Sequence, residues 1–184
     1  MWQKRTRGWA KRGERAVRVV QGRRGNNFTM TFAVCPTRGL VHHQLDEGGM
    51  NGDRFERFIE NLCAQVQLNE NEQCAIILDN ASPHRRIRDM NLPDGFEFRF
   101  LPPYSPFLNI AENAFSMWKA AVKRHMGTNR QVLLNESLHE RRMMHVANIA
   151  EVCVPEVTAE AMGNAYLHMQ TYLPRCWAQE DILY

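Results

Sequence analysis

The chain has 184 residues, of which 44% are hydrophobic and 23% charged, as expected for one globular domain that buries a core. It contains no apolar run of about 18 residues, so a membrane span is not expected. No apolar stretch follows the basic N-terminus, so a secretory signal is not expected either. The five cysteines have no C-x-x-C spacing, which indicates reduced, mostly buried thiols in an intracellular protein: Cys35, Cys63, Cys74, Cys153 and Cys176.

Positive charge is concentrated at the N-terminus. Residues 1–24 hold nine Lys and Arg against one acid, a net charge of +8, so the remainder carries −5 of the total of +3. A basic arm of this kind is typical of a segment that contacts a polyanion. A solvated tail or a localisation signal has the same composition, and charge by itself does not separate these readings.

The first half of the chain predicts strands around a turn. Residues 15–20 alternate well enough for a short edge strand, and residues 27–34 form a stronger pattern rich in Phe, Thr and Val. The turn formers at 36–39 lead back into residues 40–45, which we expect to be the hairpin partner of the second strand.

A helix is predicted over residues 54–62, with Asn51 or Asp53 as its N-cap. Its apolar residues recur at the spacing of one helix face, which we expect to be buried. They are Phe55, Phe58, Ile59 and Leu62.

Two acidic residues stand at informative places in the middle of the chain. The apolar run 74–78 is typical of a buried strand and ends at Asp79, and α/β folds place their chemistry at such strand ends. A second strand is predicted at 96–101, before a proline-rich turn. Glu112 then begins a helix that runs to about residue 125, 33 positions after Asp79. Each acid by itself is more often a turn, cap or helix-dipole residue, but the pair can meet over one metal site.

The predicted helix after Glu112 has an apolar face composed of Ala111, Phe115, Trp118 and Val122. Beyond Gly127, residues 129–150 and 155–171 predict two amphipathic helices, separated at Pro155. The candidates for burial there include Leu133, Leu138, Met144 and Ile149.

The segments LDNASPH (78–84) and FLPPYSPFLNIAENAFSMWK (100–119) resemble the core of the DDE transposases of the mariner superfamily. The stretch RTRGWAKRGERAVRVV (5–20) is similar to the basic stretch that follows that family's first catalytic strand. By position, Asp79 matches the second catalytic acid and Glu112 the third. Phe107 stands where the family often has an acid, and Ile110-Ala111 stand for its usual Pro-Ile.

The resemblance implies an α/β fold with a ribonuclease-H-like mixed sheet flanked by helices. It implies DNA cleavage and strand transfer with Mg²⁺ or Mn²⁺, because two divalent ions held by carboxylates can align the attacking oxygen and stabilise the leaving oxygen. DNA is the expected partner, a homodimer is expected as in the family, and neither a membrane nor a small-molecule substrate is expected. In a eukaryote the protein would be nuclear.

The family's first catalytic Asp precedes the Trp-Gly-basic stretch, which here lies at the start of the chain. We therefore expect a sheet that lacks its first central strand, a site with two of three acids, and impaired activity. Asp46 and Asp53 do not match the position of the first Asp. The expected divisions are a basic segment at 1–24, the partial catalytic core at 25–126, and a helical extension at 127–184.

Several further residues are candidates for contact with DNA. The proposed phosphate contacts are Lys4, Arg5, Arg7, Lys11, Arg12, His84, Arg85 and Arg86. Asn80 has two interpretations, orienting Asp79 or holding a turn. Tyr104 and Trp118 are expected to pack rather than stack on bases.

Two rival functions stay open. The chain could be a non-catalytic, transposase-derived DNA-binding or interaction protein that acts through its basic arm. It could also be an unrelated α/β metal-dependent hydrolase that uses Asp46 together with Asp79 and Glu112, in which case these three acids must meet.

Overall fold

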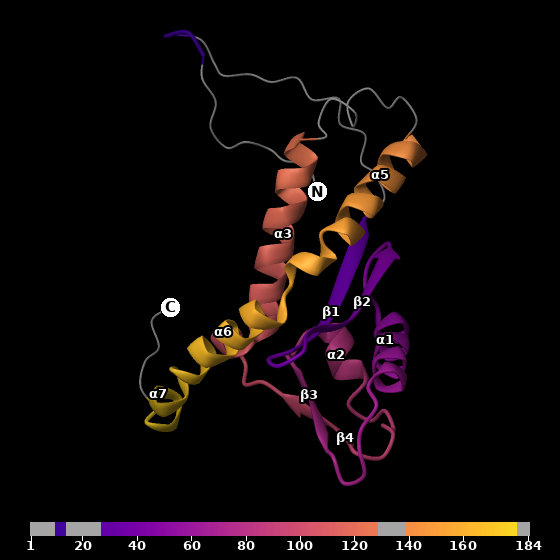
Figure 1. Cartoon of the computed structure of the whole chain (residues 1–184), viewed down its shortest axis with the longest axis vertical. Helices are drawn as coiled ribbons and strands as arrows, with labels where there is room; N and C mark the ends of the chain where they lie inside the picture. The colour runs from indigo at the N-terminus through magenta and orange to yellow at the C-terminus, as the bar shows by residue number, and fades with distance from the viewer. Residues whose placement is uncertain (1–9, 14–26, 129–138, 180–184) are drawn as a thin grey trace.

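The computed structural model describes residues 10–13, 27–128 and 139–179 (Figure 1). The strand predicted at 15–20 lies outside these residues. The described elements are β1 (Phe28–Cys35), β2 (Gly39–Glu47), α1 (Gly52–Gln65), β3 (Cys74–Leu78), α2 (Ser82–Arg86), β4 (Phe96–Phe100), η1 (Pro106–Leu108), α3 (Ile110–Thr128), α5 (His139–Val152), η2 (Val154–Glu156), α6 (Ala159–Gln170) and α7 (Leu173–Trp177). This mixed α/β arrangement confirms the predicted fold class and is compatible with a ribonuclease-H-like core followed by a helical extension.

Strands β1 and β2 form the predicted hairpin. They pair antiparallel, from Phe28 opposite Glu47 to Cys35 opposite Gly39, with an irregularity between Ala33 and Val34. Alternate side chains of β1 face opposite sides of the hairpin, as the strand period requires. Phe32 therefore packs in the core on the α3 side, whereas Ala33 packs against the core built around α1.

Helix α1 begins where the sequence predicts. Asn51 is the N-cap, because its Oδ1 accepts a hydrogen bond from the Arg54 backbone N–H at 2.9 Å. Asp53, the other candidate cap, instead pairs with Arg86 of α2 at 2.8 Å. The predicted apolar stripe is confirmed: Phe55, Phe58, Ile59 and Leu62 are all buried.

The strands form two separate sheets within the described part of the chain. β1 pairs with β2, and β3 pairs in parallel with β4. Helix α1 packs across both, since the core around it contains Ile76 and Leu78 of β3 and also meets Ala33 of β1. No strand among the described residues joins β1 to β3. Side-chain packing, rather than a continuous hydrogen-bonded ladder, therefore connects the two sheets here.

Helix α3 covers the opposite face of the hairpin from α1 (Figure 1). Phe32 stacks on Phe115 with ring centroids 4.8 Å apart and meets Trp118 edge-on at 5.6 Å. Phe115 and Trp118 of the predicted face lie toward this core, and Val122 lies in a second cluster with Ile149. The α3 residues with no exposed surface are Ala114 and Ala121. These small side chains allow close approach of the neighbouring elements, a role that a search for large apolar residues does not reveal.

The face of β3 that points away from α1 is exposed to solvent. Ile77, whose neighbours Ile76 and Leu78 are buried on the α1 side, is 61% exposed. Side chains alternate across a strand, so Ile77 points to the side that α3 covers over β1. The apolar run at 74–78 predicted a buried strand, and that is wrong for Ile77.

Helices α5, α6 and α7 follow in the described part of the C-terminal segment, with Pro155 in the short helix η2 between α5 and α6. Ile149 is buried as predicted, whereas Met144 is 66% exposed and its predicted burial is wrong. Five residues separate the two, which at 100° per residue puts Met144 about 140° around the helix from Ile149. Leu133 and Leu138 lie outside the described residues.

The five cysteines are free thiols. Cys63 and Cys153 are buried, as predicted, and burial raises the pKa of both thiols. Cys35, Cys74 and Cys176 are only partly buried, so the expectation that most are buried is wrong. Among the helices that the structure describes, none has the length and apolarity needed to cross a membrane.

Candidate active site

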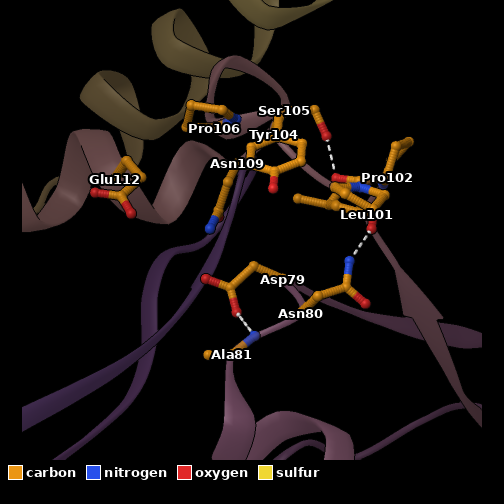
Figure 2. A pocket seen from close by; sticks show the side chains of 11 residues that line it. Asp79, Asn80, Ala81, Leu101, Pro102, Tyr104, Ser105, Pro106, Asn109 and Glu112 are labelled. Atoms are coloured by element: carbon orange, nitrogen blue, oxygen red, sulfur yellow. Dashed lines mark hydrogen bonds between the residues drawn. The ribbon is translucent and has the colours of Figure 1, made fainter.

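A pocket of about 250 Å³ lies where β3 ends, beside the proline-rich connection and the start of α3 (Figure 2). Asp79 and Glu112 both line it, although they are 33 positions apart in the sequence. The other lining residues are Asn80, Ala81, Leu101, Pro102, Pro103, Tyr104, Ser105, Pro106 and Asn109. The fold therefore brings the two sequence-predicted acids to one cavity.

Asp79 is held through one of its two carboxylate oxygens. Its Oδ1 accepts a hydrogen bond from the Ala81 backbone N–H at 2.9 Å and lies 2.6 Å from His84 Nδ1. The bond to Ala81 is the turn that an Asp favours just after a strand. Oδ2 has no hydrogen-bond partner among the described residues, and the side chain is 45% exposed. Oδ2 is thus the oxygen that Asp79 can present to a ligand.

His84 is positioned from two directions. Pro83 lies in the first turn of α2, a place where its fixed φ suits a helix, and the short helix returns the imidazole toward Asp79. The ring lies 4.2 Å from the Phe55 ring, centroid to centroid, and the side chain is only 23% exposed. His84 therefore connects the core of α1 to the carboxylate of Asp79.

Asn80 tethers the proline-rich connection to the end of β3. Its Nδ2 donates to the Leu101 carbonyl at 2.5 Å, and the Leu101 N–H donates to the Leu78 carbonyl at 2.7 Å. Arg88 donates to Asn80 Oδ1 at 3.2 Å while its guanidinium lies 4.6 Å from the Phe100 ring centroid. Asn80 thus holds a distant backbone segment, which is neither of its two predicted roles, orienting Asp79 or holding a local turn.

Glu112 lies in the first turn of α3, and its side chain is exposed. Asn109 orders that turn: its Oδ1 accepts from the Ala111 N–H and its carbonyl accepts from the Glu112 N–H, both at 3.1 Å. Figure 2 shows Asp79 and Glu112 on the same side of the pocket. Glu112 therefore faces the site from a capped helix start rather than from a loop.

Asp46, the third acid of the rival hydrolase, lies away from Asp79 and Glu112 in the structure. Asp46 accepts two hydrogen bonds from Gln44 Nε2, at 3.0 and 2.9 Å, and does not line the pocket. Within the described ranges, no three His, Cys, Asp or Glu side chains come close enough to hold a metal ion. The geometry required by the rival hydrolase with Asp46 is therefore not met.

The predicted phosphate contacts fall into three groups. Lys4, Arg5 and Arg7 lie outside the described residues, whereas Lys11 and Arg12 are exposed. On α2, Arg85 is exposed beside the site, and Arg86 is engaged with Asp53 at 2.8 Å.

The two aromatic residues with a predicted packing role behave differently. Trp118 packs as expected, and its Nε1 donates to the Ala150 carbonyl at 2.8 Å. Tyr104 is 95% exposed at the pocket, so the packing prediction is wrong for it. Its neighbours in sequence, Pro103 and Ser105-Pro106, are turn formers, and connecting segments of this kind run over the surface. That turn composition was the signal that sequence reasoning missed.

The amino-acid sequence matches the family model described as DDE superfamily endonuclease over residues 2–133. The chain belongs to this family. No curated protein and no solved structure matches it. DDE superfamily endonucleases act on DNA, so DNA is the partner implied for this chain.

DDE superfamily endonucleases also generally use divalent metal ions, and the donors at this pocket fit such an ion. Asp79 Oδ2 and the exposed carboxylate of Glu112 are hard oxygen donors at one cavity. Mg²⁺ prefers such donors and keeps several of its waters, so one or two carboxylates can be the protein's share. This member of the DDE family therefore presents two carboxylates at one pocket that are chemically suitable donors for such an ion.

Proposed function

We propose that this chain is the catalytic core of a mariner-type DDE transposase, in which Asp79 and Glu112 hold Mg²⁺ or Mn²⁺ for DNA strand cleavage and transfer. The observation that carries the proposal is the convergence of Asp79, from the end of β3, and Glu112, from the start of α3, on one pocket. The mariner assignment is supported by the motifs LDNASPH and FLPPYSPFLNIAEN.

The bound ions would stabilise the charge that develops on the phosphate and its attacking and leaving oxygens. The protein's part is to present oxygens in a defined arrangement. His84 and the Ala81 N–H fix Oδ1 of Asp79, and the Asn109 cap fixes the turn that carries Glu112. The Asn80 bond to Leu101 keeps the connection between these two groups against the end of β3.

We further propose that cleavage by this chain is weak or abolished. The resemblance implies three catalytic acids, whereas among the described residues Asp79 and Glu112 are the two acids that line the pocket. Removing one ligand from a set of three leaves the metal ions with fewer fixed oxygens, which loosens the alignment of the attacking group.

Nicking of supercoiled plasmid DNA in Mg²⁺ and in Mn²⁺ tests the activity. The parent chain is compared with Asp79→Ala and with Asp46→Ala, a carboxylate that does not line the pocket. Weak nicking that disappears in Asp79→Ala but persists in Asp46→Ala supports the proposed metal site. Vigorous nicking contradicts the proposed impairment, and nicking that survives Asp79→Ala contradicts the role of Asp79.

The second candidate function is a non-catalytic DNA-binding protein, favoured by the net charge of +8 over residues 1–24. Lys and Arg that neutralise phosphates release counterions, so affinity falls steeply with salt. Under this alternative, a double variant Asp79→Ala, Glu112→Ala binds duplex DNA as tightly as the parent at every salt concentration. Replacing Lys11 and Arg12 by Ala would reduce the salt slope by about 0.9 for each phosphate that these side chains no longer neutralise.

The remaining parts of the proposal rest on the resemblance. They are a core at 25–126 with a helical extension at 127–184, a homodimer, and a nuclear location in a eukaryote. Light scattering of the full chain at several protein concentrations would test the dimer directly, because a monomer mass at all concentrations contradicts it.

A further inference from the structure

Tyr104 has an unusual backbone and an unusual exposure at the same time. Its φ is +59°. Two other described non-glycine residues, Asn71 and Gln179, also have positive φ, but neither is aromatic. The Tyr104 side chain is 95% exposed. A bulky residue in the left-handed region is an outlier, and such outliers persist where surrounding structure imposes them, often at functional sites.

The surrounding structure does impose this conformation. Ser105, immediately after Tyr104, is buried, and its Oγ donates to the Pro102 carbonyl. The Ser105 carbonyl in turn accepts from the Leu108 N–H at 3.1 Å. Pro103 and Pro106 restrict the backbone on either side, and Asn80 holds the start of the connection at Leu101. The side chain of Tyr104 therefore projects from a loop whose backbone is fixed on both sides.

The ring lies beside the two carboxylates. Tyr104 lines the same pocket as Asp79 and Glu112, and Figure 2 shows its hydroxyl directed into that pocket above Asp79. Three prolines line the pocket around it, namely Pro102, Pro103 and Pro106. The pocket thus offers a flat aromatic face, surrounded by apolar proline rings, next to the proposed metal-binding carboxylates. A matching ligand is flat, weakly polar and attached to a phosphodiester. A nucleobase has this chemistry.

We propose that Tyr104 is a stacking platform for an unpaired DNA base adjacent to the phosphodiester that Asp79 and Glu112 address. This inference rests on the proposed function for the identity of the ligand, but it concerns binding rather than cleavage. Within a duplex, stacking requires that the base leave the helix, because neighbouring base pairs cover both of its faces. The Asn80–Leu101 tether would then set the spacing between the stacked base and Asp79.

The test uses a duplex with a single bulged 2-aminopurine, whose fluorescence falls when the base stacks. Binding by the full chain is followed in EDTA, so that no metal-dependent cleavage interferes. We expect the parent, Tyr104→Phe and Tyr104→Trp to quench the probe, because all three keep an aromatic face. Tyr104→Ala should abolish the quench and bind the bulged duplex about tenfold more weakly, the typical effect of removing one base–aromatic contact.

Trp177→Ala is the matched control, since Trp177 is 78% exposed but does not line the pocket, and it should quench like the parent. Circular dichroism of each variant separates loss of stacking from loss of folding. A quench by Tyr104→Ala equal to that of the parent overturns the inference. Loss of the quench in Tyr104→Phe also overturns it, because the hydroxyl rather than the ring would then make the contact.

The two proposals fail separately. If the quench depends on Tyr104 while Asp79→Ala nicks plasmid DNA as the parent does, base stacking stands and the proposed role of Asp79 fails. If nicking depends on Asp79 but Tyr104→Ala quenches normally, cleavage stands and base stacking fails. An absence of quench by the parent at every salt concentration overturns the stacking inference.

Discussion

His84 Nδ1 lies 2.6 Å from Asp79 Oδ1, the same oxygen that accepts the Ala81 backbone N–H at 2.9 Å. Two contacts on one oxygen leave Oδ2 as the oxygen available at the pocket. The imidazole is itself held against Phe55, 4.2 Å away between ring centroids. His84 therefore links the orientation of Asp79 to the buried core of α1. Replacing His84 should change the orientation of the Asp79 carboxylate.

We expect His84→Ala to weaken Mn²⁺ binding to the full chain by about 10- to 100-fold, the usual range for loss of a group that orients a metal ligand. Calorimetric titration with Mn²⁺ would measure this without reference to cleavage. His43→Ala is the control, because His43 pairs with Glu151 at 2.9 Å, away from the pocket lining. Equal Mn²⁺ affinity in His84→Ala and the parent would show that His84 does not orient Asp79.

Ile59→Ala should lower the free energy of unfolding by about 2–5 kcal/mol, as large-to-small changes in a packed core do. Ile59 is 1% exposed and belongs to the core that connects the two sheets through α1. Urea denaturation measures the loss. Glu60→Ala, on the exposed side of the same helix, should change stability by no more than about 0.5 kcal/mol, and a similar loss in both variants would contradict the packing argument.

Gly39→Ala should destabilise the fold by more than about 1 kcal/mol, because a left-handed residue with a Cβ is strained. Gly39 has φ +74°, and an added Cβ would lie 2.6 Å from the Ala159 backbone nitrogen of α6. Gly49→Ala is the control, since no atom lies within 4 Å of its added Cβ. Thermal unfolding measures the difference. Equal melting temperatures for Gly39→Ala and Gly49→Ala would contradict the close approach of the hairpin to α6.

Tyr104→Gly should raise the free energy of unfolding by up to about 1 kcal/mol. Glycine adopts positive φ without the cost that Tyr104 bears, although the greater freedom of glycine in the unfolded chain offsets part of the gain. Tyr104→Ala keeps the strain and should show no gain, so the two variants form a matched pair in urea denaturation. A lower stability for Tyr104→Gly than for Tyr104→Ala would mean that the left-handed conformation is not costly here.

Short-range patterns in the sequence were enough to predict several local elements of this protein and to single out the two acids that line its pocket. The stripe of α1 and the cap at Asn51 depend on residues within a few positions of each other, and the hairpin depends on alternation and turn formers. Asp79 and Glu112 were identifiable because each stands in a distinctive motif. These signals are local, and local patterns are what periodicity, capping and motif comparison detect.

Packing between distant segments sets the remaining features. The exposure of Ile77 follows from α3 covering β1 and leaving this face of β3 open. The contact of Phe55 with His84 joins residues 29 positions apart, and the exposure of Tyr104 follows from how Ser105 and Asn80 tie the loop to its surroundings. Burial and side-chain direction are properties of the packed molecule, so no window of the sequence contains them.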